Sequence, residues 1–400
     1  MGETPSMFWR LLTASGLSNL ADGLVKVSLP LVAVQFTHSP ALIAGLAFAV
    51  TVPWLLFALP AGALADRLDR RLAMIGANAV RATAIGCLAF GAGSIWLLYA
   101  VAFAIGTAET IHDTAAQSIL PQVVPRTDLS RANGRLFAVE FTANEFAGPP
   151  IAGVLVAAGS TLAFATPAGL WFLALGALLL VRGRFRVERA TRTTLRADIA
   201  EGLRFLWRNR LLRTLAVMVG AINLVTSAVF GVFVLYAVGP MGLSEQAYGL
   251  LMACTAAGSV AGSFAAGFLE RRIGRARSLV LTILCATAMV GVPAFTNGHL
   301  AVGSALFVGG AGIMVWNVIT VSLRQRVTPD RLLGRLSSAY RLVAWGTMPL
   351  GAAIGGLLAQ FAGVRVVFVA GALVLLAQLA AMRIVTDRRM DEAERDAIEP

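Results

Sequence analysis

The chain has 400 residues, of which 58% are hydrophobic and only 14% are charged, and its mean hydropathy is +0.77. This composition excludes an ordinary soluble domain and indicates a membrane protein. A formal net charge of +12 would also suit a nucleic-acid-binding protein, so the positions of the basic residues have to decide between the two.

Apolar runs of roughly 20 residues recur along the whole chain. Each run is long enough to cross a hydrocarbon core of about 30 Å as a helix. The predicted helices are 9–36, 41–64, 72–92, 95–117, 133–158 and 162–181 in the first half, and 211–238, 246–269, 278–295, 300–323, 336–361 and 365–385 in the second. The expected fold class is an all-α membrane protein with twelve transmembrane helices.

The arginines gather in every second loop of this pattern. Clusters follow the predicted helices with even numbers, and they include Arg126, Arg271, Arg324 and Arg388. The intervening loops carry almost no charge. Because basic residues are retained on the cytoplasmic side, the pattern places both termini in the cytoplasm and argues against nucleic acid as a partner.

Neither the cysteines nor the histidines are grouped as metal ligands. The three cysteines fall inside predicted helices, and the histidines, His38, His112 and His299, are far apart in the chain. Glycine pairs such as Gly258 and Gly262 lie inside apolar runs, where they favour close helix packing over phosphate binding. We therefore expect no metal, no cofactor and no enzymatic activity.

The chain contains an internal repeat. "GALADRLDRR" (62–71) aligns with "GFLERRIGRA" (267–276), and "VVPRTDLSRANG" (123–134) aligns with "RVTPDRLLGRLS" (326–337) at nearly the same shift of about 205 residues. Two motifs that agree on one shift predict two parallel-related six-helix bundles. The expected domains are bundles at 1–182 and 211–386, a cytoplasmic linker with a short amphipathic helix at 183–210, and a cytoplasmic tail at 387–400.

These motifs resemble those of the major facilitator superfamily. The residues that match its loop signature are Gly62, Ala65, Asp66, Arg67, Arg70 and Arg71. Asp69 stands where a second glycine is usual. "ILPQVVPRTDLSRANG" and "NEFAGPPIAGVL" resemble the drug:proton antiporter branch, which includes macrolide and enterobactin exporters. In its fifth-helix pattern Gly148, Pro149 and Gly153 match, whereas Asn144 replaces the usual first glycine.

The resemblance implies a secondary active transporter in the bacterial plasma membrane that works by alternating access as a monomer. Its partners are the lipid bilayer, protons and a small-molecule substrate. We expect proton-coupled export of an amphipathic or hydrophobic, drug-like small molecule. The alternatives are a lysophospholipid or a siderophore as the substrate, or a membrane sensor that does not transport.

The charged loop at 62–71 is a candidate conformational latch, formed by Gly62, Asp66, Arg67, Arg70 and Arg71. The Asp66 carboxylate can accept hydrogen bonds from a helix N-terminus and pair with an arginine, and Gly62 lets two backbones approach closely. Both contacts would hold only while the cytoplasmic side is closed. In the alternative interpretation these charges only fix the topology.

Ionisable side chains inside the predicted helices are concentrated in the first half. The acids there are the candidates for proton coupling: Asp22, Glu145, Glu109, Glu140 and Asp113. Their candidate charge partners are Lys26, Arg81 and Arg341. Asp22 and Glu145 lie near the membrane midplane, where a carboxyl group can load and release a proton, and Asp22 is the leading carrier. In the alternative interpretation Asp22 pairs permanently with Lys26, one turn away, and Glu109 and Glu140 hold helices together through an arginine.

The second half offers neutral polar and aromatic side chains instead. The candidates for the substrate cavity are Asn223, Phe230, Phe233, Trp316 and Asn317. Aromatic residues at helical spacing also pack against neighbouring helices, which is the alternative role for these side chains.

Overall fold

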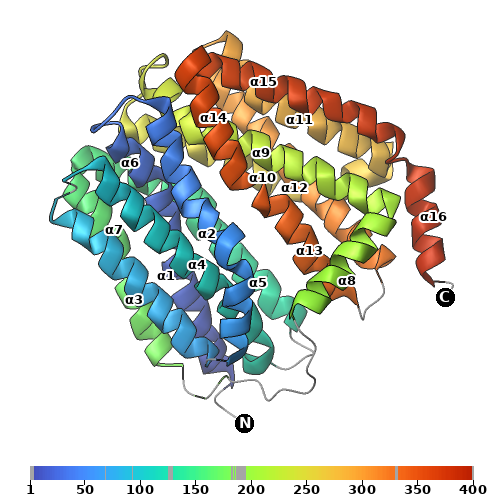
Figure 1. Cartoon of the computed structure of the whole chain (residues 1–400), viewed down its shortest axis with the longest axis horizontal. Helices are drawn as coiled ribbons and strands as arrows, with labels where there is room; N and C mark the ends of the chain where they lie inside the picture. Colours follow the sequence, from blue (N-terminus) through green and yellow to red (C-terminus); the bar gives the residue numbers. More distant parts are fainter. Residues whose placement is uncertain are drawn as a thin grey trace. The chain divides into compact units, whose positions relative to one another are not determined.

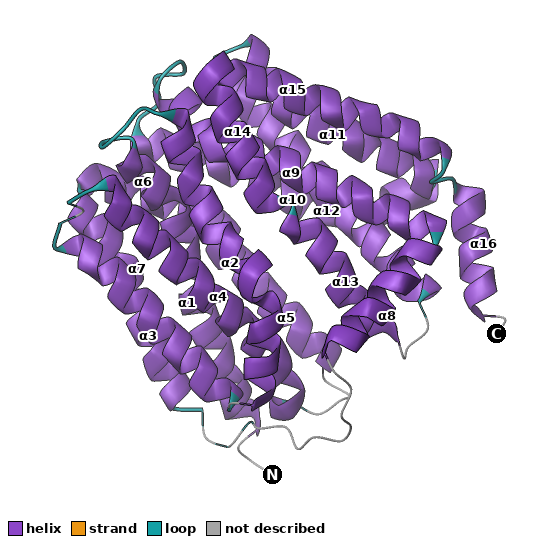
Figure 2. Ribbon diagram, in the orientation of Figure 1, coloured by secondary structure: helices purple, strands orange, loops and turns teal. Residues whose placement is uncertain are grey.

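The computed structural model describes residues 4–67, 69–91, 93–124, 129–181, 183, 185, 195–328 and 332–398. All regular structure in these residues is helical (Figure 2). The chain forms two compact units. Unit 1 comprises Met1–His38, Gly45–Arg192 and Leu243–Ala253, and unit 2 comprises Ser39–Ala44, Thr193–Gly242 and Cys254–Pro400.

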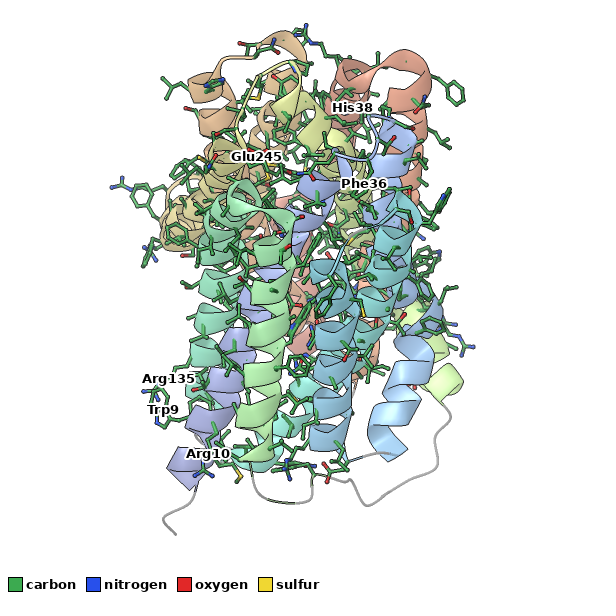
Figure 3. All side chains as sticks on the ribbon, turned by 90° about the vertical axis from the view of Figure 1, so that its left-hand side faces the viewer. Trp9, Arg10, Phe36, His38, Arg135 and Glu245 are labelled. Carbon is green, nitrogen blue, oxygen red and sulfur yellow. The ribbon has the colours of Figure 1, made fainter. Side chains whose placement is uncertain are left out.

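Unit 1 is built from the helices of the first half of the chain, coloured blue to green in Figure 1. They are α1 (Thr4–Ala33), α2 (Pro40–Arg67), α3 (Arg70–Ala89), α4 (Ile95–Val123), α5 (Leu129–Phe141), the π-helix η2 (Thr142–Ala147), α6 (Gly148–Ala158) and α7 (Ser160–Leu179). α1 packs against α6, α7 and η2, and α3 packs against α4 and α7. Figure 3 places Trp9 and Arg10 at one end of unit 1 and Phe36 and His38 at the other, so α1 runs the full height of the unit.

Unit 2 contains most of the second half. Its helices are α8 (Leu195–Arg208), α9 (Arg210–Val238), α10 (Glu245–Ile273), α11 (Arg275–Phe295), α12 (His299–Val327), α13 (Leu333–Gly346), α14 (Met348–Ala362), α15 (Val364–Ala377), the 3-10 helix η4 (Gln378–Arg383) and α16 (Asp387–Ile398). α11 packs against α12 and α15, and α9 packs against α14. The first turns of α10 belong to unit 1, and the first turns of α2 belong to unit 2.

The predicted all-α membrane fold is confirmed. Ten helices in the described part of the chain are long and apolar enough to cross a membrane by length and composition. The two other predicted spans correspond to α1 and to the broken segment α5–η2–α6, both of which carry charged side chains within the helix. The apolar pattern therefore located these ten helices, and charged residues distinguish the two remaining predicted spans.

Side-chain caps explain where several helices begin. Asp69 accepts a hydrogen bond from the main-chain N–H of Arg71 at the start of α3, and Asn209 accepts one from Leu212 at the start of α9. Such caps satisfy N–H groups that have no partner within the helix. Each cap directly precedes an apolar run, so it fixes the residue at which the span begins.

The fifth span is interrupted by consecutive prolines. Pro149 has no N–H, so the carbonyl group of Glu145 loses its regular helical partner. The chain adopts the π-helix η2 there, and the N–H of Gly148 bonds to the carbonyl oxygen of Ala143, five residues earlier. Local π-helical adjustment of this kind is how membrane helices accommodate proline.

Candidate functional site

A buried ion pair joins α1 to α3 in unit 1. A guanidinium nitrogen of Arg81 lies 2.9 Å from a carboxylate oxygen of Asp22, and the Arg81 side chain is 0% exposed. Removing one partner of a buried ion pair destabilises a protein, because the remaining charge loses its neutralising partner. The pair therefore fixes α1 and α3 against each other.

Arg81 has three further partners. Its second terminal nitrogen donates hydrogen bonds to Ser18 Oγ at 3.0 Å and to Asn78 Oδ1 at 2.5 Å. Its guanidinium carbon lies 5.1 Å from the centroid of the Trp171 ring on α7, within the range of a cation–π interaction. Because these contacts do not involve Asp22, they keep the Arg81 side chain in place when the charge of Asp22 changes.

A second ion pair joins α1 to η2. Lys26 Nζ lies 2.6 Å and 2.7 Å from the two carboxylate oxygens of Glu145. Both side chains are partly exposed, Lys26 at 55% and Glu145 at 40%. This corrects the pairing considered from the sequence: Lys26 binds Glu145 and Asp22 binds Arg81, although Lys26 and Asp22 are one turn apart.

The π-helix directs two consecutive side chains towards α1. Asn144 Nδ2 donates to Asn19 Oδ1 at 3.4 Å, and the next residue, Glu145, binds Lys26. In a regular α-helix, successive side chains point about 100° apart. The wider turn of η2 accommodates both contacts, so the proline-induced break positions the acid of this ion pair.

Glu140, Asp113 and Glu109 complete the acids of unit 1. Glu140 accepts a hydrogen bond from Ser15 Oγ at 2.7 Å, and Asp113 Oδ1 lies 3.3 Å from Nδ1 of the buried His112. Within the described residues Glu109 has no ion pair or hydrogen bond. The arginine bridge considered for Glu109 and Glu140 is not found among the residues described, and the Arg341 side chain lies outside them.

Charges from three helices act on Glu109. Asp22 and Asp113 repel its charged form, whereas Arg81 and Lys26 attract it. Glu109 thus belongs electrostatically to the same cluster as the two ion pairs.

The residues of the antiporter-like motif lie where the fifth span crosses α1. A methyl group added to Gly148 would lie 2.7 Å from the Cα of Gly23, and one added to Gly23 would overlap the main chain of Asn144. Gly153 approaches the main chain of Glu245 in the same way, within unit 1. Small residues of this kind allow two backbones to touch. The π-helix ends at Ala147, and Gly148 and Pro149 begin α6.

The corresponding crossing in unit 2 is held by neutral groups. On the first helix of the second half, α9, the polar residues at this crossing are Asn223 and Ser227. The Asn223 amide donates to the carbonyl oxygen of Ala344 at 2.8 Å, and the Ser227 hydroxyl donates to that of Met348 at 2.7 Å. These side chains satisfy main-chain groups beside the break between α13 and α14. The Asn223 side chain therefore contributes to helix packing.

The remaining candidates for the substrate cavity differ in how deeply their side chains are buried. Phe233 is 1% exposed and packs against Tyr236 and Phe368, and Trp316 is buried in the hydrophobic core of unit 2. Both side chains therefore pack between helices in this structure. Phe230, which contacts Phe233, is half-buried. Asn317 is exposed and donates to the carbonyl oxygen of Ile313, so these two remain cavity candidates.

Only part of the latch motif is described. The side chains of Asp66 and Arg67 and the surroundings of Gly62 lie outside what is described, although α2 extends to Arg67. Arg71 donates from Nε and Nη2 to the carbonyl oxygens of Leu178 and Leu179, each at 2.9 Å.

The neighbouring residues make similar links. Asp69 accepts from the N–H of Phe185 at 3.0 Å, and the N–H of Arg70 donates to the carbonyl oxygen of Phe185 at 3.3 Å. The second part of the motif therefore fastens the start of α3 to the end of α7.

Three partners of Arg81 were not identified from the sequence. Asn78 lies three residues before Arg81, and Ser18 lies four residues before Asp22, so both share a helical face with the ion pair. That spacing could have identified them. No such helical spacing links Trp171 on α7 to the ion pair. In the described part of the chain, no three His, Cys, Asp or Glu side chains are grouped so that they could hold a metal ion.

Residues 4–400 match the family described as "Transmembrane secretion effector". An uncharacterized MFS-type transporter, y4rN of Sinorhizobium fredii, is 30% identical over 402 residues, covering 97% of this chain and 96% of the relative. The multidrug efflux pump Tap of Mycobacterium tuberculosis is 29% identical over 420 residues, covering 98% of this chain and 96% of Tap.

Solved structures of low sequence identity share the fold. A bacterial homologue of the human lysosomal transporter Spinster matches with a TM-score of 0.74 at 14% identity, covering 98% of each chain. The nucleoside transporter NupG matches with a TM-score of 0.77 at 12% identity, covering 94% of this chain and 98% of NupG. The chain belongs to the transmembrane secretion effector family of the major facilitator superfamily, and it is a multi-pass secondary transporter of small molecules rather than an enzyme.

Proposed function

We propose that the protein exports an amphipathic or hydrophobic small molecule in exchange for protons, and that unit 1 handles the protons. The observation that carries this proposal is the ion pair between Asp22 and the fully buried Arg81. Ionisable residues are expensive inside a membrane and usually mark a substrate or proton pathway. Asp22 is the proposed proton carrier.

The surroundings of Arg81 support this role for Asp22. A proton on Asp22 removes the negative partner of Arg81, but Ser18, Asn78 and Trp171 still hold the guanidinium group. The carboxyl group can therefore gain and lose a proton without leaving a buried charge entirely alone. Glu145 is the second candidate, although its protonation would take the ion-pair partner from Lys26.

The exposed pair of Lys26 and Glu145 indicates where water reaches unit 1. A partly exposed ion pair within a membrane span is tolerated on a surface that faces water, not on one that faces lipid. The face of α1 and η2 that carries this pair therefore borders the proposed translocation pathway. The acids of unit 1 then lie beside the route of the substrate.

The second half of the chain supports the assignment of proton coupling to unit 1. Between residues 211 and 386 the acids are Glu245, Glu270 and Asp330. The first two lie at the two ends of α10, and Asp330 lies between α12 and α13. None of them occupies the middle of a span. We therefore assign substrate binding and the conformational change to the second half of the chain.

The drug-like substrate and the direction of transport rest on the relatives. Tap is named as a multidrug efflux pump and is related over nearly the whole chain. The basic residues support a cytoplasmic location of both termini: Arg10 and Arg135 lie at the end of unit 1 opposite His38 and Glu245 (Figure 3). The proposed location is the bacterial plasma membrane, where the protein works as a monomer.

Flux through the purified protein in proteoliposomes tests the proposal. We expect an imposed pH gradient to drive uphill movement of ethidium, an amphipathic dye, and a protonophore to abolish it. Movement of a fluorescent lysophospholipid or a ferric siderophore in place of the dye would reassign the substrate. If none of the three probes moves uphill under the gradient, proton-coupled export of this substrate class is contradicted.

A further inference from the structure

The last helix of the chain, α16, docks on unit 2. Its Met390 side chain is 0% exposed and belongs to the same hydrophobic core as Leu279 of α11 and Leu323 of α12. α16 follows a bend after η4 and packs against α12 (Figure 1). The residues expected to form a tail are therefore part of the folded unit.

Alternating charges connect α16 to three other helices. Arg275 at the start of α11 binds both Asp391 and Glu394 of α16, the latter at 2.5 Å. Glu394 also lies 3.4 Å from Arg326 near the end of α12. Arg326 in turn lies 4.0 Å from Glu270 near the end of α10. Each charge has a neighbour of opposite sign, and the chain of contacts links α10, α11, α12 and α16.

α16 also caps α11. Asp387 Oδ1 accepts a hydrogen bond from the main-chain N–H of Ala276 at 2.9 Å. The residue before α11 is Gly274, with a φ of +85°, and a methyl group there would come 3.0 Å from the second oxygen of Asp387. Glycine therefore provides both the backbone conformation and the space for an acid that comes from elsewhere in the chain.

The repeat explains why that acid comes from α16. With the shift of 205 residues, Asp69 aligns with Gly274, and each directly precedes its helix, α3 or α11. In unit 1, Asp69 caps α3 from within the loop. The second copy of the motif has no carboxylate at this position, and Asp387 binds the helix start in its place. A negative charge is favourable at a helix N-terminus, whichever part of the chain provides it.

We propose that α16 is the missing acidic part of the second charged loop, and that it holds the ends of α10, α11 and α12 together as one body. The spacing of its residues fits this role. Asp387, Met390, Asp391 and Glu394 share one helical face, and all four contact the bundle although Asp391 remains partly exposed. Arg388, Arg389 and Arg395 are exposed. This docking does not depend on the substrate or on proton coupling, so it can be tested independently of the proposed function.

A buried reporter on α16 tests the docking in the full chain. The three native cysteines are replaced by serine, and Met390→Cys is labelled with a maleimide in detergent solution. We expect Met390→Cys to be protected, and Glu394→Arg to raise its labelling rate at least tenfold. The matched control is Glu392→Arg on the same helix, because Glu392 pairs only with Arg388 of α16 in the described structure. It should leave the rate unchanged.

Thermal unfolding of the same variants tests the structural role. Glu394→Arg should lower the midpoint by more than about 3 °C, whereas Glu392→Arg should leave it within about 1 °C. Asp387→Asn, which retains an oxygen that accepts a hydrogen bond, should give an intermediate result. If Glu394→Arg fails to fold, Arg275→Gln replaces it, with the same expected changes. Fast labelling of the Met390→Cys variant without a second substitution would overturn the proposal. So would equal effects of the charge reversals Glu394→Arg and Glu392→Arg.

Discussion

Asp22 and Lys26 lie four residues apart on α1, yet each forms its ion pair with a different helix, Asp22 with Arg81 of α3 and Lys26 with Glu145 of η2. The first pair is largely buried and the second is partly exposed. The two charges on α1 therefore have separate partners and separate environments. A substitution at one position leaves the other pair in place, so their roles can be measured independently.

The buried pair predicts which double mutant restores stability. Asp22→Asn should lower the free energy of unfolding by about 1–3 kcal/mol, because Arg81 keeps its neutral partners but loses its negative one. Adding Arg81→Met should recover most of the loss, and adding Lys26→Met should not. Thermal unfolding in detergent measures both. Recovery by Lys26→Met instead would show that Lys26 is the true partner of Asp22.

The exposed pair predicts a small effect on stability. Glu145→Gln should change the free energy of unfolding by less than about 1 kcal/mol, because water can solvate Lys26 and exposed ion pairs contribute little. Transport should still be altered if this face borders the pathway. Unfolding and dye flux are measured on the same preparation. A loss of stability as large as that of Asp22→Asn would mean that the pair is buried.

The crossing of α1 with the fifth span predicts a sharp difference between two glycines. Gly23→Ala should destabilise the protein, because the added methyl group would overlap the main chain of Asn144. Gly169→Ala on α7 is the matched control, since a methyl group there meets no atom within 4 Å. Alanine favours a helix by about 0.8–1.0 kcal/mol relative to glycine, so the control should be neutral or stabilising. Equal melting temperatures for the two variants would contradict the close crossing.

The charged loop predicts different effects for its two acids. Asp69→Ala should lower the free energy of unfolding by about 1 kcal/mol, because it removes the cap of α3. Asp66→Asn should leave stability unchanged but slow transport at least tenfold, because the proposed latch would lose its charge-assisted contacts. Unfolding and flux assays separate the two. Normal transport by Asp66→Asn would leave the loop with a role in topology only.

The sequence predicted the spans well because hydropathy and length decide them. The run at 211–238, for example, corresponds to α9, Arg210–Val238. Membrane crossing requires this pattern wherever a helix lies in the fold. The charged residues singled out in unit 1 form ion pairs there, Asp22 with Arg81 and Lys26 with Glu145, as is usual for ionisable groups that avoid lipid.

The partners within the cluster could not be read from the sequence. Lys26 is the nearest cation to Asp22 along α1, but the choice of Arg81 depends on how α1, α3 and α7 pack. The position of Glu145 depends on the π-helix, which follows from Pro149 and Pro150 only once the local hydrogen bonds are considered. The docking of α16 was not predicted because its inner face combines acids with few apolar residues, chiefly Met390, so mean hydropathy gives no sign of it.

The most direct test of proton coupling in unit 1 is ethidium flux in proteoliposomes that contain Asp22→Asn. We expect the variant to lose uphill movement driven by a pH gradient and to retain downhill exchange, because the amide preserves the shape of the side chain but cannot carry a proton. Glu392→Gln on α16 is the control and should pump like the unmodified protein. Undiminished uphill movement by Asp22→Asn would contradict the account and move the proton carrier to another acid.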